Sequence, residues 1–172
     1  MTDGAEAGGS GGASVDARGD ERPPPLCPSA QPHMDGARAI GLVNHDGDAP
    51  EVSYLERPVP ADDDLLGLCG PVAPTELFRF AAPCQTSACS HWDGTDCGLA
   101  TRIVALLPVS SLLLPKCHIR AECRWYLQEG RAACARCPQV VTQNEDPSSS
   151  MREAATPQVR GVGGGGGAKS NS

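Results

Sequence analysis

Seven of the nine cysteines lie in one stretch, from Cys84 to Cys137, and this clustering limits the chain more than any other feature. Their spacing is C-x4-C-x7-C-x19-C-x5-C-x10-C-x2-C. Short spacings let neighbouring thiolates reach one centre without closing long loops, which suits soft metals and iron–sulfur clusters. The closest pair, Cys134 and Cys137, has the spacing common to zinc sites and clusters. We therefore expect this stretch to bind a metal.

The start of the chain decides between metal binding and disulfides. The sequence MTDGAEAGGSGG has neither a basic segment nor an apolar one, so we expect no signal peptide and a cytoplasmic protein. In a reducing cytoplasm, grouped thiols bind metal or do redox chemistry more often than they form disulfides. Cys27 is isolated in PPPLCPS and is expected to be a bystander. The longest apolar run, 103–114, contains Pro108 and is shorter than the roughly 20 residues of a membrane span.

Composition divides the chain into three parts. Residues 1–37 have few large apolar side chains, so we predict a disordered acidic leader. Residues 146–172 include the run GVGGGGGAKSNS, which predicts a disordered Gly/Ser tail. The remaining residues, 38–145, form the predicted cysteine-rich metal-binding domain.

Within 38–145 the pattern predicts a β-hairpin followed by helices. The runs AIGLV and EVSYLERPV flank a turn segment, and three aspartates precede a short helix over 65–69. A further helix begins near Cys97 and ends before Pro108, and another covers 117–130. The chain has only two Trp, two Tyr and two Phe, so we predict that metal binding supplies much of the folding free energy. The expected fold is a small α-rich, metal-stabilised domain with an N-terminal β-hairpin and disordered termini.

A chain reversal at Gly130 determines how the thiols group. On one continuous helix Cys134 would lie roughly 16 Å from Cys123, too far for one centre. With a reversal, one four-thiolate set consists of Cys117, Cys123, Cys134 and Cys137. The second set consists of three thiolates, Cys84, Cys89 and Cys97. Its fourth ligand would be Cys69, His91 or an exogenous ligand. A mixed grouping, with one cluster drawing on both halves, remains open.

The ligand type favours an iron–sulfur cluster over zinc. The set is nearly all cysteine, and the histidines are not at zinc-finger spacing, so we expect one or two clusters of the 4Fe-4S type. Zinc held by four thiolates is the alternative. His91 and His118 are adjacent to cysteines in sequence and are either ligands or polar neighbours of the sulfur atoms. Cys69 is either a ligand or a small buried side chain.

The sequence CHIRAECRWY, residues 117–126, resembles the C-terminal half of the cluster motif of the WhiB-like iron–sulfur proteins of actinobacteria. In that family the second cysteine of a CxxC opens a C-x-[VI]-R-x-x-C helix. Here Leu114 stands where the first cysteine of that pair is expected, and no Gly-Trp-Gly-Gly turn follows. The resemblance implies a cluster and a role in DNA-binding regulation. The wider pattern is similar to small cysteine-rich metal-binding proteins of high-GC bacteria, which implies no particular activity.

The motifs indicate binding more than catalysis, because no GxxxxGK[ST], HExxH or GxSxG sequence occurs. The leading hypothesis is an iron–sulfur protein in redox transfer or sensing, with a redox or other protein partner. The second is a structural zinc module that binds a protein partner. The third is a cluster-bearing DNA-binding regulator, since 116–136 contains five basic residues, Arg120 and Arg124 among them, against two acids. The same bases would also offset the charge of a thiolate cluster.

Overall fold

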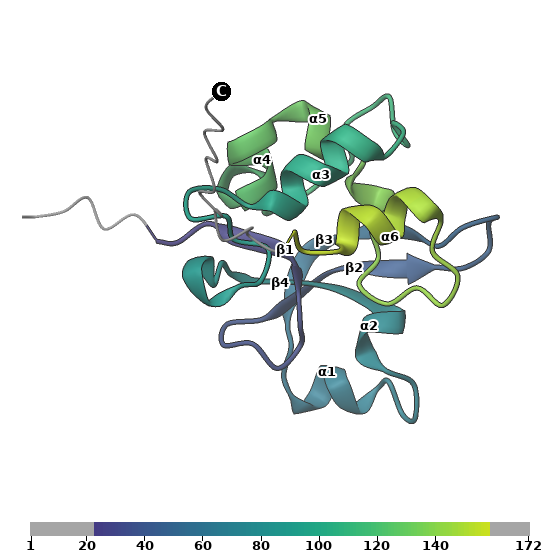
Figure 1. Ribbon diagram of the computed structural model, residues 1–172. Helices are drawn as coiled ribbons and strands as arrows, with labels where there is room; N and C mark the ends of the chain where they lie inside the picture. The colour runs from purple at the N-terminus through teal and green to yellow at the C-terminus, as the bar shows by residue number, and fades with distance from the viewer. Residues whose placement is uncertain (1–22, 159–172) are drawn as a thin grey trace, which may run out of the picture.

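The computed structural model describes residues 23–158, and their fold is built on a four-stranded antiparallel sheet (Figure 1). The strand order is β1-β4-β2-β3. The strands are β1 (Leu26–Ala30), β2 (Arg38–Asn44), β3 (Glu51–Pro60) and β4 (Phe78–Pro83). Strands β2 and β3 form an antiparallel pair, which confirms the predicted hairpin. Strand β1 pairs with β4 at one edge of the sheet.

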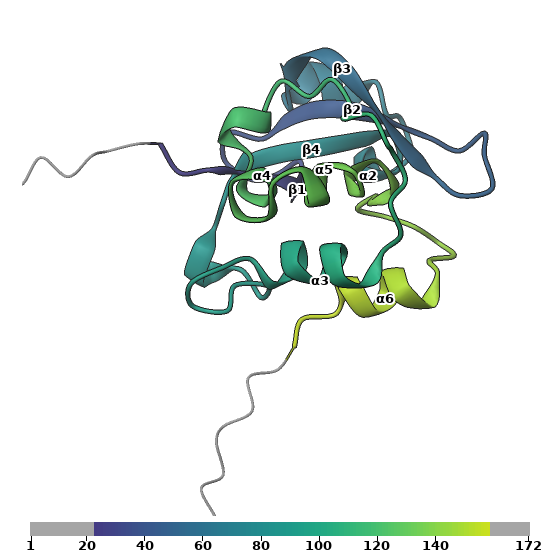
Figure 2. The same ribbon diagram turned by 90° about the horizontal axis from the view of Figure 1, so that it is seen from above.

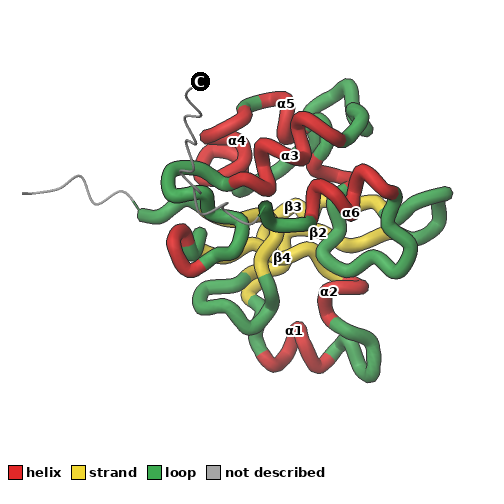
Figure 3. Tube along the Cα trace, in the orientation of Figure 1, coloured by secondary structure: helices red, strands yellow, loops and turns green. Residues whose placement is uncertain are grey.

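Short helices connect and cover the strands (Figure 3). The described residues contain α1 (Asp63–Gly67), α2 (Pro74–Leu77), α3 (Gly98–Leu106), α4 (Arg124–Glu129), α5 (Arg131–Cys134) and α6 (Ser149–Ala155). They also contain the 3-10 turns η1 (Thr86–Ala88), η2 (Arg120–Glu122) and η3 (Cys137–Gln139). Within 23–158, no helix has both the length and the apolar character needed to cross a membrane.

The prediction of an α-rich, metal-stabilised domain is wrong. An antiparallel sheet forms the framework, and within residues 23–158 no group of three or more Cys, His, Asp or Glu side chains is arranged to hold a metal ion. Strand β4, with the sequence FRFAAP, was not predicted because alanine and proline are poor strand formers. Phe80 and Ala82 nevertheless pack on one face of the sheet, while Ala81 packs on the other.

Two of the predicted boundaries are also wrong. Strand β1 lies inside the predicted leader, and helix α6 lies inside the predicted tail. Both elements are stabilised by tertiary contacts that local composition does not reveal: β1 pairs with β4, and Arg102 of α3 donates to the carbonyl of Ala154 in α6 at 2.8 Å. The predicted disorder of 1–22 and 159–172 falls outside the described residues.

The two faces of the sheet carry different elements (Figure 2). Helices α3 to α6 lie on one face, where Ile103 and Trp125 pack with Ile40 and Ala81 of the sheet. Helix α1 lies on the other face, where Leu65 packs with Phe80. Most of the cysteine-rich stretch therefore lies on one face, and the sheet separates it from α1.

The helices of this stretch agree only in part with the prediction. Helix α3 covers Gly98–Leu106 as expected, and Asp62 caps α1 by accepting a hydrogen bond from the amide of Leu65 at 3.0 Å. The predicted helix over 117–130 is instead divided, because Cys123 has an extended backbone between η2 and α4. Gly130 ends α4 with a φ of 61°, a conformation that glycine adopts without steric cost, and the chain turns there into α5.

Candidate metal centres

Eight of the nine free cysteines fall into two groups of four, on the basis of their electrostatic interactions with one another. The C-terminal group consists of Cys117, Cys123, Cys134 and Cys137. The N-terminal group consists of Cys27, Cys84, Cys89 and Cys97. In both groups burial is the main reason that thiol pKa values rise, and the charges of neighbouring thiolates raise them further.

The C-terminal group is assembled by the turn at Gly130. Cys117 and Cys123 flank η2, and the reversal after α4 brings Cys134 and Cys137 back towards them. The backbone amides of Tyr126 and Trp125 lower the pKa of the Cys123 thiol, although the Cys123 side chain accepts no capping hydrogen bond at the start of α4. Burial outweighs this effect and raises the pKa to about 12. Cys123 therefore keeps its proton near neutral pH in the structure described.

Two side chains from the sheet also reach the C-terminal group. The hydroxyl of Tyr54 in β3 donates to Cys137 Sγ at 3.0 Å, and Arg79 Nη2 in β4 lies 4.0 Å from the same sulfur. Burial raises the pKa of Tyr54 well above its usual range, so the hydroxyl keeps its proton and remains a donor. The sulfur of Cys137 is thus surrounded by hydrogen-bond donors on the side of the sheet.

Arg79 is the most unusual of these residues because its side chain is fully buried, with 0% exposure. Its Nε donates to the carbonyl of Pro28, and its guanidinium stacks on Trp125 with 5.4 Å to the ring centroid. Its Nη1 and the indole Nε1 of Trp125 are both buried without a hydrogen-bond partner among the described residues. A buried donor without a hydrogen-bond partner lowers the stability of a protein, so we expect an acceptor to lie beside these two groups.

The N-terminal group joins β1 to the loop between β4 and α3. Cys27 lies opposite Ala82 in the β1–β4 pair, and the amide of Cys84 donates to the carbonyl of Pro25 at 2.8 Å. Cys27 and Cys84 therefore occupy diagonal positions on neighbouring strands. Cys89 and Cys97 follow in the loop, and Cys97 immediately precedes α3.

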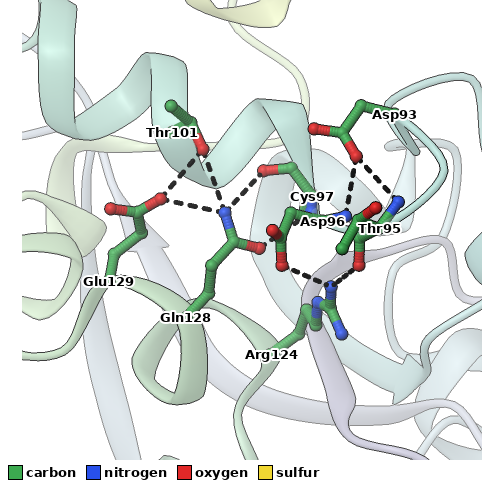
Figure 4. A network of polar contacts seen from close by, with 8 residues as sticks. All are labelled: Asp93, Thr95, Asp96, Cys97, Thr101, Arg124, Gln128 and Glu129. Carbon is green, nitrogen blue, oxygen red and sulfur yellow. Dashed lines mark hydrogen bonds and ion pairs between the residues drawn. The ribbon is translucent and has the colours of Figure 1, made fainter.

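Gln128 of α4 fixes the backbone at Cys97 (Figure 4). Its Oε1 accepts from the amide of Cys97 at 2.8 Å, and its Nε2 donates to the carbonyl of Cys97 at 3.1 Å. The same Nε2 lies 3.0 Å from Thr101 Oγ1, and Thr101 in turn donates to Glu129 at 2.9 Å. One glutamine therefore joins the segment that carries Cys123 to the segment that carries Cys97.

Arg124 makes a second connection between these segments. Its Nη2 donates to the carbonyl of Thr95 at 2.9 Å and to the carboxylate of Asp96 at 3.2 Å. Its guanidinium also lies over Trp92, with 4.7 Å to the ring centroid. Arg120, the other arginine considered for nucleic-acid contact, donates to the carbonyl of Pro115 and to the sulfur of Cys134. Both side chains are committed to contacts inside the protein.

The remaining predicted ligands lie apart or are otherwise occupied. Cys69 is buried beside α1, and its thiol donates to the carbonyl of Leu65 at 3.9 Å. His91 Nδ1 lies 2.8 Å from Arg102 Nη2; since a guanidinium only donates, this nitrogen is an acceptor that is already used. His118 is exposed. None of the three joins either group in the interactions described above.

The sequence did not identify three residues that the structure places in these groups. Cys27 was considered a bystander because it is 57 residues from Cys84, and only the pairing of β1 with β4 brings the two together. Tyr54 and Arg79 lie on strands outside the cysteine-rich stretch. Arg79 could have been noticed in the sequence, because it is a charged residue within the apolar run FRFAAP.

Residues 117–126, which carry the resemblance to the WhiB-like proteins, form η2, the extended Cys123 and the start of α4. The resemblance stays a prediction. No family model matches this chain, and neither the curated proteins nor the solved structures contain a match to it.

Proposed function

We propose that this protein binds an iron–sulfur cluster through Cys117, Cys123, Cys134 and Cys137 and serves redox transfer or sensing in the cytoplasm, with a redox protein as its partner. The observation that carries the proposal is the buried guanidinium of Arg79 beside Cys137. Cluster binding would draw the four sulfur atoms inward from their positions in the structure.

The first argument concerns charge. A buried guanidinium is costly unless a negative charge lies close to it. The hydrogen bonds of Arg79 go to the carbonyl of Pro28 and to the sulfur of Cys137, and neither group carries a full charge when the thiol is protonated. Four thiolates around a cluster leave a net negative charge on the centre, and this charge would compensate the buried cation.

The second argument concerns the orphaned donors. Arg79 Nη1 and Trp125 Nε1 are buried without partners. A cluster contains inorganic sulfide ions besides the cysteine sulfurs, and these accept hydrogen bonds from nearby donors. A zinc ion held by four thiolates brings no acceptor of its own. The donors therefore favour a cluster over zinc at this position.

The third argument concerns the alternative of a DNA-binding regulator. Arg120 and Arg124, whose replacement would test that hypothesis, donate to groups within the protein. A side chain that contacts phosphate must be free to reach it. We therefore assign the local positive charge to neutralising the thiolate centre.

Anaerobic purification of the full chain tests the proposal. We expect broad visible absorption together with bound iron and sulfide, and we expect Cys123→Ser and Cys137→Ser to lower iron and sulfide per chain. Cys69→Ser is the matched control, because Cys69 is equally buried but belongs to neither group, and it should retain full metal content. A colourless protein, with stoichiometric zinc or with no metal, would overturn the proposal.

A further inference from the structure

The N-terminal group is a second set of four neighbouring thiols, although within residues 23–158 no three of them are arranged to hold a metal ion. The thiol of Cys27 interacts electrostatically with Cys97 and Cys84, and the thiol of Cys97 with Cys84 and Cys89, so these interactions link all four. Cys27, Cys89 and Cys97 also line one cavity of about 620 Å³. Three of the four cysteines therefore border a common space, and a metal would have to draw the sulfur atoms together.

Backbone amides influence two of the sulfur atoms in this group. The amides of Ala100 and Leu99 lower the pKa of the Cys97 thiol, and the amide of Ser29 lowers that of the Cys27 thiol, although the Cys97 side chain accepts no capping hydrogen bond at the start of α3. The partial positive charge of an amide favours a thiolate over a thiol. The backbone at these two sulfurs therefore favours the anionic form that binds a metal.

The loop that carries Cys89 and Cys97 is held in place on both sides. The amide of Trp92 donates to the carbonyl of Cys89 at 3.0 Å, and the amide of Gly98 donates to the carbonyl of His91 at 2.8 Å. Gln128 holds Cys97 from the opposite side. The backbone at Cys89 and Cys97 is therefore held by hydrogen bonds, and bringing the sulfur atoms together requires movement of the side chains.

The fourth ligand of this set is Cys27 and not His91. The Nδ1 of His91 accepts from Arg102, so the proton of the neutral ring lies on Nε2 and neither nitrogen has a free lone pair. Cys69, the other residue considered, follows α1, and its thiol donates to the carbonyl of Leu65 in that helix. Cys27 already interacts with two members of the set.

The two groups are close neighbours across β1. Leu26 forms an isolated bridge with Cys123 of the C-terminal group, and the next residue, Cys27, belongs to the N-terminal group. The cation of Arg79 acts electrostatically on Cys27 and also contacts Cys137. One buried cation therefore lies between two sets of four thiols.

We propose that Cys27, Cys84, Cys89 and Cys97 form a second four-thiolate centre for a thiophilic metal, separate from the C-terminal group. This proposal does not depend on which metal the C-terminal group binds. It requires only that Cys27 and Cys123 serve different centres.

Metal analysis of the full chain, purified anaerobically, tests the second centre. We expect Cys27→Ser to lower the metal content per chain by about half and Cys123→Ser to remove the other half, with no loss in Cys69→Ser. Folding of each variant is checked by circular dichroism. Full metal content in a folded Cys27→Ser protein would overturn the second centre, whereas full content in Cys123→Ser would overturn only the proposed function.

A measurement on the unmodified protein covers the case in which Cys27→Ser does not fold. Iodoacetamide labelling followed by mass spectrometry is compared before and after removal of the metal with a chelator. Cys27 is half-buried. If it is a metal-bound thiolate, we expect it to be protected from labelling before chelation and to be labelled after the metal is removed. Equal labelling of Cys27 in both samples would refute its role as a ligand.

Discussion

The hydroxyl of Tyr54 donates a hydrogen bond to Cys137 Sγ across 3.0 Å, although 83 positions separate the two residues. Hydrogen bonds to a ligand sulfur stabilise the more negative, reduced state of a cluster. The sheet therefore contributes to the chemistry of the C-terminal group as well as to its support.

Replacing Tyr54 by phenylalanine should lower the reduction potential of the proposed cluster. A bond of about 1 kcal/mol corresponds to a decrease of about 40 mV for a one-electron couple. Anaerobic redox titration followed by visible absorption measures the change. Tyr126→Phe is the control, since the hydroxyl of Tyr126 makes no hydrogen bond within residues 23–158, in contrast to that of Tyr54. An unchanged potential in Tyr54→Phe would show that the bond is absent in the metal-bound protein.

Replacing Arg79 by leucine should destabilise the metal-bound protein by roughly 3–5 kcal/mol, the usual cost of removing one partner of a buried charge pair. The side chain is fully buried, and its loss removes the Arg79 donor from the carbonyl of Pro28 and leaves Tyr54 as the donor to the sulfur of Cys137. Urea unfolding of anaerobically purified protein gives the free energy of unfolding.

Arg57→Leu is the matched control for Arg79→Leu. Arg57 lies on β3 and is exposed, so its replacement should change the free energy of unfolding by no more than about 0.5 kcal/mol. Equal effects of the two substitutions would mean that no anionic group lies beside Arg79.

Local patterns predicted the elements that local interactions determine. The β2–β3 hairpin, the aspartate cap of α1 and helix α3 depend on residues close together in sequence, and all three were found. A helix end at Gly130 was also predicted and is found, whereas the grouping of Cys117 and Cys123 with Cys134 and Cys137 at one centre stays a prediction. Each of these features depends on residues that are near one another along the chain.

Long-range pairing accounts for what the sequence did not predict. Strand β1, with the sequence LCPSA, has a weak strand propensity because it contains Pro28, and it is formed by pairing with the distant strand β4. The position of Cys27 beside Cys84 follows from that pairing. The sequence alone leaves Cys84, Cys89 and Cys97 without a fourth thiolate, and Cys69, His91 or an exogenous ligand was therefore considered for that position.

Replacing Gln128 by alanine should weaken the N-terminal group more than the C-terminal group. The variant leaves the amide of Cys97 without its partner, which costs about 1–3 kcal/mol, while the carbonyl keeps the hydrogen bond from the amide of Thr101 at 3.3 Å. Urea unfolding and metal analysis measure the two effects. Gln85→Ala is the control, because its side chain makes one exposed bond of 3.3 Å to the carbonyl of Pro83. Equal metal loss in both variants would mean that Gln128 does not position Cys97.

The core between α3 and the sheet can be tested without reference to a metal. Ile103 is fully buried at 0% exposure and packs with Trp125 and Leu99, so Ile103→Ala should lower the free energy of unfolding by roughly 2–5 kcal/mol. Leu112 is 90% exposed, and Leu112→Ala should change it by no more than about 0.5 kcal/mol. Urea unfolding of both variants measures the contrast. Similar values for the two would mean that α3 does not pack against the sheet, and the arrangement of Cys97 beside Cys27 would then lose its structural basis.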